Sequence, residues 1–133
     1  TLHHNYFHNL VQRAPRVRFG KVHVYNNYYQ TDDENGEYRY AYSLGVGKNS
    51  KIYAENNVAD IDGRTYQDFV KVFGGTELTT LNNIFNGAKI DTFSEHLSQV
   101  TWTPDRSMKI DDVNEVKAKV LQQAGVFKEA IIP

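Results

Sequence analysis

The sequence contains no cysteine, and this absence excludes disulfide bonds, thiolate metal sites and a cysteine nucleophile. It also has no excess of one charge, because 15 Lys and Arg stand against 16 Asp and Glu, a formal net charge of −1. A general binder of nucleic acid or of anionic membranes carries a basic excess. No long apolar run is present to span a bilayer, and the mean hydropathy is −0.60. We therefore expect neither a nucleic-acid partner nor a membrane.

The length of 133 residues corresponds to one domain. The chain begins at Thr1 without Met, already inside a patterned segment and without the features of a signal peptide. We therefore expect that further sequence precedes it.

Four segments repeat one pattern: a short β-prone run, an asparagine, and two apolar or aromatic residues. The asparagines are Asn5, Asn27, Asn57 and Asn83, at spacings of 22, 30 and 26 residues. These spacings are typical of single coils of a parallel β-helix with loops of variable length. Asparagine tolerates a left-handed backbone, and its amide can bond the same residue on the next coil. The alternative is independent turns, but such turns favour glycine after the asparagine.

The C-terminal part has a different period. Asp112-Val113-Asn114-Glu115 matches a capping box, and Val113, Val116, Val120 and Ala124 share one helical face. Gly125 stands where a helix would stop. The pattern predicts an amphipathic helix over 113–124 that covers the sheet.

The predicted fold is therefore all-β, a solenoid with coils over about 1–100 and a packing tail and helix over about 101–133. The long connection 60–75 carries Tyr66, Phe69, Val70 and Phe73, spaced for a short helix.

The strongest chemical signal is a run of three arginines within six residues, Arg13, Arg16 and Arg18, around Pro15. Proline fixes the backbone and removes a donor, which indicates a stiff connection rather than a mid-sheet strand. Arginine presents a planar fork that binds carboxylates in a bidentate manner. A rigid loop that holds several arginines predicts a polyanionic ligand.

Three stretches together resemble the bacterial pectate lyases of polysaccharide lyase family one. They are His3-His4-Asn5-Tyr6-Phe7, the run Arg13-Ala14-Pro15-Arg16-Val17-Arg18-Phe19-Gly20, and Val22-His23-Val24-Tyr25-Asn26-Asn27-Tyr28-Tyr29. The family signature, Arg-x-Pro-x-x-Arg, is matched by Arg13, Pro15 and Arg18. The resemblance implies a right-handed parallel β-helix that cleaves polygalacturonate by calcium-dependent β-elimination. It extends to Val100-Thr101-Trp102-Thr103-Pro104 and so covers nearly the whole chain.

By this resemblance, Arg13 corresponds to the catalytic base and Arg18 to a binder of the substrate carboxylate, and we assign Arg16 to the same binding role. The proton to be removed lies α to a uronate carboxylate, so neutralising that carboxylate makes the proton more acidic. Arginine is an unusual base, because a free guanidinium keeps its proton to above about pH 12. Neighbouring cations favour the neutral form of such a group.

The resemblance also implies what this chain lacks. In the family, the calcium-binding aspartates and a substrate-binding lysine lie on coils before the arginine motif, so we expect no metal site in this chain. We expect the C-terminal portion of an incomplete solenoid, with the N-terminal remainder of the same enzyme as its partner. The isolated chain should then be inactive, and the enzyme should be extracellular.

Other residues suggest weaker hypotheses. The histidines His3, His4, His8 and His23 allow a zinc site, but packing and hydrogen bonding explain them better. Asp60-Ile61-Asp62-Gly63 resembles the start of a calcium loop, and a solvated turn is the alternative; Asp32-Asp33-Glu34 is read as a solvated loop. The aromatic residues from Tyr25 to Tyr29 fit inward packing better than ligand stacking. Weak candidates for groove contacts are Arg64, Tyr66, Lys48 and Lys51.

Two further functions compete with a pectate lyase. A non-catalytic solenoid could hold uronates on its arginines without abstracting a proton, and an RNA-binding module could use the arginine run with flanking tyrosines. The net charge and the absence of an RNA-binding signature argue against RNA. A pectin lyase acting on methylated substrate is a nearer alternative, but three arginines favour the charged, unmethylated polymer.

Overall fold

The computed structural model describes residues 1–32, 40–93, 96–105 and 107–131. No helix in these ranges is long and apolar enough to cross a membrane. The elements follow in this order: β1 (Leu2–His3), β2 (Tyr6–His8), β3 (Arg16–Val17), β4 (Gly20–Tyr25), β5 (Tyr28–Thr31), β6 (Leu44–Gly47), β7 (Ser50–Glu55), β8 (Val58–Ile61), the one-turn 3-10 helix η1 (Tyr66–Asp68), β9 (Val70–Phe73), β10 (Glu77–Leu81), β11 (Asn83–Phe85), β12 (Ala88–Ile90) and α1 (Val113–Ile131).

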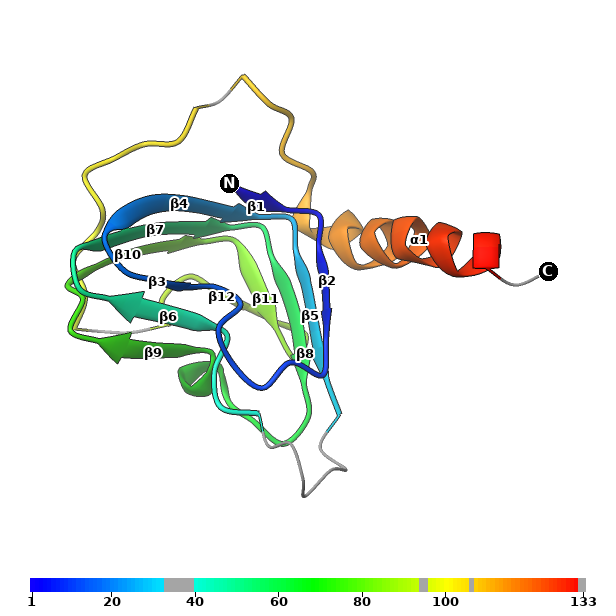
Figure 1. Ribbon diagram of the computed structural model, residues 1–133, viewed down its shortest axis with the longest axis horizontal. Helices are drawn as coiled ribbons and strands as arrows, with labels where there is room; N and C mark the ends of the chain where they lie inside the picture. Colours follow the sequence, from blue (N-terminus) through cyan, green and yellow to red (C-terminus); the bar gives the residue numbers. More distant parts are fainter. Residues whose placement is uncertain (33–39, 94–95, 106, 132–133) are drawn as a thin grey trace.

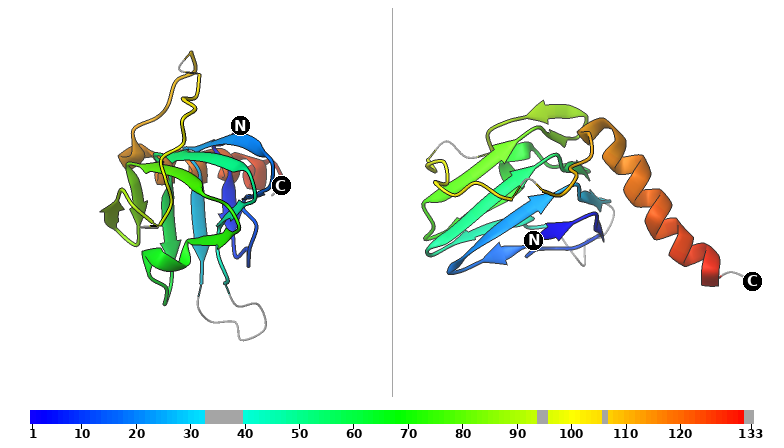
Figure 2. Two further views of the ribbon diagram at one scale, coloured as in Figure 1. Left: turned by 90° about the vertical axis from the view of Figure 1, so that its left-hand side faces the viewer. Right: turned by 90° about the horizontal axis from the view of Figure 1, so that it is seen from above.

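The strands form three sheets that the chain visits in turn (Figure 1). Sheet A is ordered β1-β4-β7-β10, sheet B β12-β11-β8-β5-β2 and sheet C β3-β6-β9. Neighbouring strands are parallel, except in the antiparallel hairpin β11–β12. Strands of successive coils therefore stack on one another, as the view from above shows (Figure 2). The predicted parallel β-helix is confirmed.

The register keeps inward side chains aligned from coil to coil. In sheet A, Val22 pairs with Ile52 and Ile52 with Leu78, while Val24 pairs with Ala54. The core also takes Tyr29 and Ile61 from sheet B and Val46 from sheet C, all almost fully buried. Burial of apolar surface from three sides holds the coils together.

Sheet C departs from the sequence prediction. The expected short helix over 66–73 is wrong beyond its first turn, because η1 ends at Asp68 and β9 begins at Val70. Val70 and Val72 favour a strand through their branched side chains, although their spacing from Phe69 and Phe73 also fits a helix. The arginine run was expected to be a connection rather than a mid-sheet strand, and it contains only the two-residue strand β3 at the edge of sheet C.

A ladder of asparagines forms the corner between sheets A and B, as predicted. The side-chain amides of Asn5, Asn27, Asn57 and Asn83 bond in series at 3.0–3.1 Å. The left-handed backbone belongs instead to the residue before each rung, with φ of 53–55° at His4, Asn26, Asn56 and Asn82. The first residue of each pair turns the chain and the second forms the ladder, which the sequence did not reveal; the Asn26 side chain also donates to the Asn56 carbonyl on the next coil, at 3.1 Å. We call the four ladder asparagines and the residue before each of them the asparagine corner.

Helix α1 covers the outer face of sheet B near its start and then runs away from the coils (Figure 1). Asp112 caps it, since its Oδ1 accepts a hydrogen bond from the Asn114 N–H at 2.9 Å. The predicted face packs on Tyr28 and Val58 through three buried residues, Val113, Val116 and Val120; the side chain of Ala124 lies outside the described part.

The predicted stop at Gly125 is wrong, because α1 continues to Ile131. A glycine within a helix costs about 1 kcal/mol relative to alanine, which a helix with formers on both sides tolerates.

The tail before α1 crosses the outer face of sheet A. Thr79 Oγ1 donates to Gln99 at 2.8 Å, and Trp102 meets Tyr53 edge-on at 6.4 Å. At its end, Asp111 exchanges two hydrogen bonds with Asn26, at 2.7 and 2.9 Å. The tail thus anchors the start of α1 to the asparagine corner.

Candidate functional site

The arginine run lies at a different corner, in the connection from sheet B to sheet C. Arg13, Pro15, Arg16 and Arg18 line an open hollow of about 510 Å³. We call these four residues the arginine corner. The side chains proposed from the sequence as base and carboxylate binders are therefore neighbours in space.

The backbone of the arginine corner is held from beneath. The Ala14 N–H donates to the Ser43 carbonyl at 2.8 Å, and the Tyr29 hydroxyl donates to the Ala14 carbonyl at 2.8 Å. The Gly45 N–H donates to the Pro15 carbonyl at 2.9 Å. Ala14 and Tyr29 are both buried. These bonds fix the loop on the sheets, so the arginines project from a rigid base.

Arg13 has a strained backbone. Its φ is +63°, in the left-handed region that costs a residue with a Cβ roughly 1–2 kcal/mol. The same left-handed conformation occurs at His4 and Asn26, where it turns the chain between two sheets. It therefore identifies Arg13 as the turning residue of this corner.

The charge of this corner is not neutralised locally. Arg13, Arg16 and Arg18 are exposed. Within the described ranges, no carboxylate lies at ion-pair distance from any of them. Fixed cations without counter-ions concentrate anionic ligands, so the geometry suits a carboxylate-bearing ligand.

Tyr29 and Ser43 were not recognised as supports of the site. Inward packing was predicted for the Tyr25–Tyr29 aromatics, and Tyr29 does stack on Phe7 at 4.8 Å. Tyr28 instead faces outward beneath α1. Burial raises the pKa of the Tyr29 phenol, which keeps it a neutral donor to the Ala14 carbonyl. The one feature of the sequence that could have indicated Tyr29 as a support is the aromatic pair Tyr28-Tyr29 after Asn27.

The weaker groove candidates do not line the hollow. Lys51 forms an ion pair with Glu77 on the next coil. Lys48 is exposed in the turn after sheet C. Tyr66 packs edge-on against Phe93 at 6.3 Å, and Arg64 is half-buried near it in the chain.

Hydrogen bonds and ring packing hold the four histidines, and His3 Nδ1 and His4 Nδ1 also lie at hydrogen-bond distance from each other, 2.8 Å. The contacts are His4 Nε2 to Asp111 Oδ2 at 2.6 Å, His23 Nε2 to Glu55 Oε2 at 2.6 Å, His3 stacked on Tyr25 at 4.9 Å, and His8 Nε2 to Asp32 Oδ2 at 3.9 Å. Glu34 and Asp33, the rest of the predicted acidic loop, lie outside the described residues.

The side chain of Asp60 is held by two hydrogen bonds and does not belong to a solvated turn. Its Oδ2 accepts from the Tyr28 hydroxyl and from Lys117 Nζ, each at 2.8 Å, so it ties sheet B to α1. The solvated-turn prediction fits only Asp62 and Gly63, which are exposed. Across the part of the chain described, no three His, Asp or Glu side chains are grouped to hold a metal.

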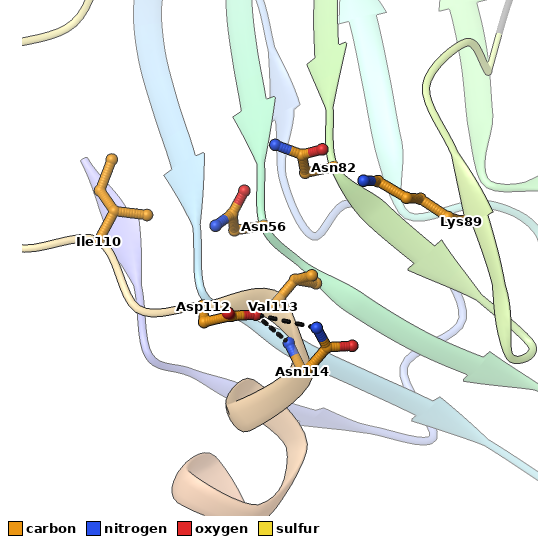
Figure 3. A pocket seen from close by; sticks show the side chains of 7 residues that line it. All are labelled: Asn56, Asn82, Lys89, Ile110, Asp112, Val113 and Asn114. Carbon is orange, nitrogen blue, oxygen red and sulfur yellow. Dashed lines mark hydrogen bonds between the residues drawn. The ribbon is translucent and has the colours of Figure 1, made fainter.

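A second hollow, of about 430 Å³, lies at the asparagine corner where α1 begins (Figure 3). Asn56, Asn82 and Lys89 line one side, and Asp112 and Asn114 line the other. Its cation and its carboxylate offset each other, whereas the arginine corner is wholly basic. The arginine corner is therefore the stronger candidate for an anionic ligand.

Comparison with known proteins adds three findings. A family model described as "Pectate lyase" matches residues 1–129. A pectate lyase of Bacillus subtilis is 47% identical over 131 residues, 96% of this chain and 31% of that protein. A pectate trisaccharide-lyase of Bacillus licheniformis is 32% identical over 130 residues, 96% of this chain and 35% of that protein.

The solved structures agree. A pectate lyase bound to a hexasaccharide superposes with a TM-score of 0.84 at 47% identity, over 90% of this chain and 31% of that one. The chain therefore spans about a third of the length of the relatives it matches.

Proposed function

Because this chain belongs to the pectate lyase family, we propose that it carries the base and the carboxylate-binding arginines of a lyase that cleaves polygalacturonate. The observation that carries the proposal is the arginine corner. Its three arginines are exposed and have no described counter-ion. They lie on a loop whose backbone is hydrogen-bonded to Ser43 and Gly45.

In β-elimination, the base takes the proton at C5 of a galacturonate unit, next to the carboxylate. The electron pair of that C–H bond forms the C4–C5 double bond while the bond from C4 to the glycosidic oxygen breaks. The oxygen leaves with the departing sugar and takes up a proton from water. We assign proton removal to Arg13 and binding of the carboxylate to Arg18 and Arg16.

The three arginines divide the work by charge. Arg18 and Arg16 offset the carboxylate and so stabilise the negative charge that develops when C5 loses its proton. Arg13 must give up one guanidinium proton before it acts as a base. Turnover should therefore increase with pH.

The family implies calcium, and the described residues do not form its site. The described residues contain no group of three carboxylates or histidines, whereas calcium prefers six to eight oxygen ligands. We place the calcium ligands on coils that the relatives have and this chain does not cover. The arginine corner then acts as the cationic half of a shared site.

Besides the polygalacturonate substrate, the proposed second partner is the N-terminal remainder of the enzyme. β1, β2 and β3 lie at the ends of their sheets, and no described strand pairs with their outer edges. An unpaired strand edge is a template for a further strand. We propose that the N-terminal remainder of the enzyme stacks there as further parallel coils, that neither nucleic acid nor a membrane is a partner, and that the enzyme acts outside the cell on its polymeric substrate.

The test compares two proteins. One is this chain alone, and the other is a chimera in which it replaces the matched third of the Bacillus subtilis pectate lyase. The ultraviolet absorbance of the unsaturated product is followed on polygalacturonate. We expect turnover from the chimera and none from the isolated chain. An inactive but folded chimera contradicts the proposal, and full activity of the isolated chain contradicts the shared site.

The same assay separates the alternatives. A non-catalytic uronate-binding solenoid would bind oligogalacturonate and form no unsaturated product. A pectin lyase would prefer the methyl-esterified polymer and resist a chelator. We expect the chimera to prefer the unesterified polymer and to stop when a chelator is added.

A further inference from the structure

The outer face of sheet C carries a further cation, Lys71, beside Arg16 of the arginine corner. Arg16 Cζ lies 3.8 Å from the centre of the Phe73 ring, and Lys71 Nζ lies 5.4 Å from the same centre. Both distances are within the roughly 6 Å over which a cation is attracted to an aromatic face. Strands β3 and β9 therefore direct two positive groups to one aromatic ring.

The register of sheet C explains why these residues meet. Arg16 pairs with Gly45 and Gly45 with Lys71, so the three form one row across the coils. Val17 and Val46, their neighbours along the strands, are buried in the core. Because side chains alternate along a strand, the row faces outward.

Gly45 leaves the space that Arg16 occupies. A Cβ at Gly45 would lie 2.7 Å from Arg16 Cγ and 2.9 Å from Arg16 Cβ. These atoms are at the base of the arginine side chain, so the clash could not be relieved by its flexible end alone. The absence of a side chain at 45 thus lets the arginine stem lie across the middle strand toward Phe73.

The two cations have no described counter-ion. No carboxylate in the described ranges lies at ion-pair distance from Arg16 or Lys71. Two like charges directed to one ring repel each other unless an anion lies between them. A carboxylate is the anion that the guanidinium fork fits best.

We propose that Arg16 and Lys71 form a second carboxylate-binding position for a uronate unit, with Gly45 and Phe73 as positioning residues that hold Arg16 in place. The proposal rests on the proposed function for the identity of the ligand. It adds Lys71, Gly45 and Phe73 to the groove and extends the binding surface from the arginine corner across sheet C.

The test is a titration of the full chain with unesterified trigalacturonate, followed by the NMR signals of the arginine Nε–H groups. Lys71→Gln keeps the length of the side chain and removes its charge, so we expect about five-fold weaker binding. Phe73→Leu should weaken binding to a similar degree and remove the ring-current shift of the Arg16 side chain. Phe73→Tyr should restore both. Lys89→Gln, an exposed lysine at the other corner, is the matched control and should bind as the unchanged chain does.

The outcomes separate the two proposals. If Lys71→Gln and Phe73→Leu bind as tightly as the unchanged chain while Arg18→Ala binds more weakly, this inference is wrong and the proposed function stands. If no arginine signal of the unchanged chain responds to trigalacturonate, this inference is wrong, and the proposed function is decided by the activity of the chimera. Equal binding of the methyl-esterified trisaccharide would also overturn the carboxylate position. Gly45→Ala should displace the Arg16 side chain. The variants at Lys71 and Phe73 decide the test, so the test does not depend on whether Gly45→Ala folds.

Discussion

The asparagine corner and the arginine corner are two solutions to the same geometric task, turning the chain from one sheet into the next. The asparagine corner repeats in every coil, and its polar groups bond mainly to one another: Asn57 accepts from Asn27 and donates to Asn83. The arginine corner occurs once among the described coils, and its arginine side chains are exposed, with Arg16 lying against Phe73 of sheet C. No described carboxylate forms an ion pair with them.

The two corners also differ in where their support lies. Three of the four rungs of the asparagine ladder, Asn27, Asn57 and Asn83, are buried, so the side chain is the support. At the arginine corner the backbone carries the support, through Tyr29, Ser43 and Gly45. A corner built for stability buries its polar side chains, and a corner built for binding anchors its backbone and exposes them. The comparison predicts that substitutions affect folding at one corner and chemistry at the other.

The largest expected effect is on turnover, from Arg13→Lys. The substitution keeps the positive charge and removes the guanidinium that we assign as base. General-base catalysis contributes roughly 10²–10⁴-fold, so we expect kcat of the chimera to decrease by about 10³-fold. Affinity for trigalacturonate and the melting temperature should hardly change. A large decrease in the melting temperature would instead show that Arg13 stabilises the fold, and the two corners would then not differ in their roles.

The second effect is on folding, from Asn57→Ala. The substitution removes side-chain bonds to the Asn27 amide groups, the Val24 carbonyl and Asn83, and leaves buried polar groups without partners. At about 1 kcal/mol for each of these bonds, the free energy of unfolding should decrease by about 4 kcal/mol. Denaturant titration measures it, with Asn82→Gly as control.

These two corners also show what the sequence could predict. The ladder was predictable because the same residue recurs at each coil, and the arginine motif because it lies in one continuous segment. Sheet C was not, since Arg16–Val17, Leu44–Gly47 and Val70–Phe73 share no recurring residue. The supports of the arginine corner come from segments 15 to 30 residues away, such as Tyr29 beneath Ala14. Contacts of this kind depend on the stacking register, which spacing alone does not specify.

The third effect depends on pH and concerns the junction of the asparagine corner with the tail. Hydrogen bonds from His4 and then from Lys119 hold the pKa of Asp111 below its usual range. A lowered pKa in the folded state means that this stabilisation is complete above about pH 4 and is lost as the pH falls through the lowered value.

Asp111→Asn should therefore decrease the free energy of unfolding by about 1–2 kcal/mol at neutral pH, because hydrogen bonds to a charged group are lost. The difference between the variant and the unchanged chain should shrink at pH 3. Denaturant titrations of both proteins at the two pH values measure it. A difference that does not change with pH would show that the charge of the Asp111 carboxylate is not what stabilises the junction.

The smallest effect distinguishes the two asparagines of one pair. Asn82 has a φ of +53° and an exposed side chain, whereas its neighbour Asn83 is a buried rung of the ladder. Glycine adopts a left-handed backbone without penalty, so Asn82→Gly should change the free energy of unfolding by no more than about 0.5 kcal/mol. Asn82→Val should decrease it by about 1–2 kcal/mol, since a branched side chain is strained at positive φ. If Asn82→Gly instead destabilised the chain as strongly as Asn57→Ala, the first asparagine of each pair would also act through its side chain, and turning and tying would not be separate roles.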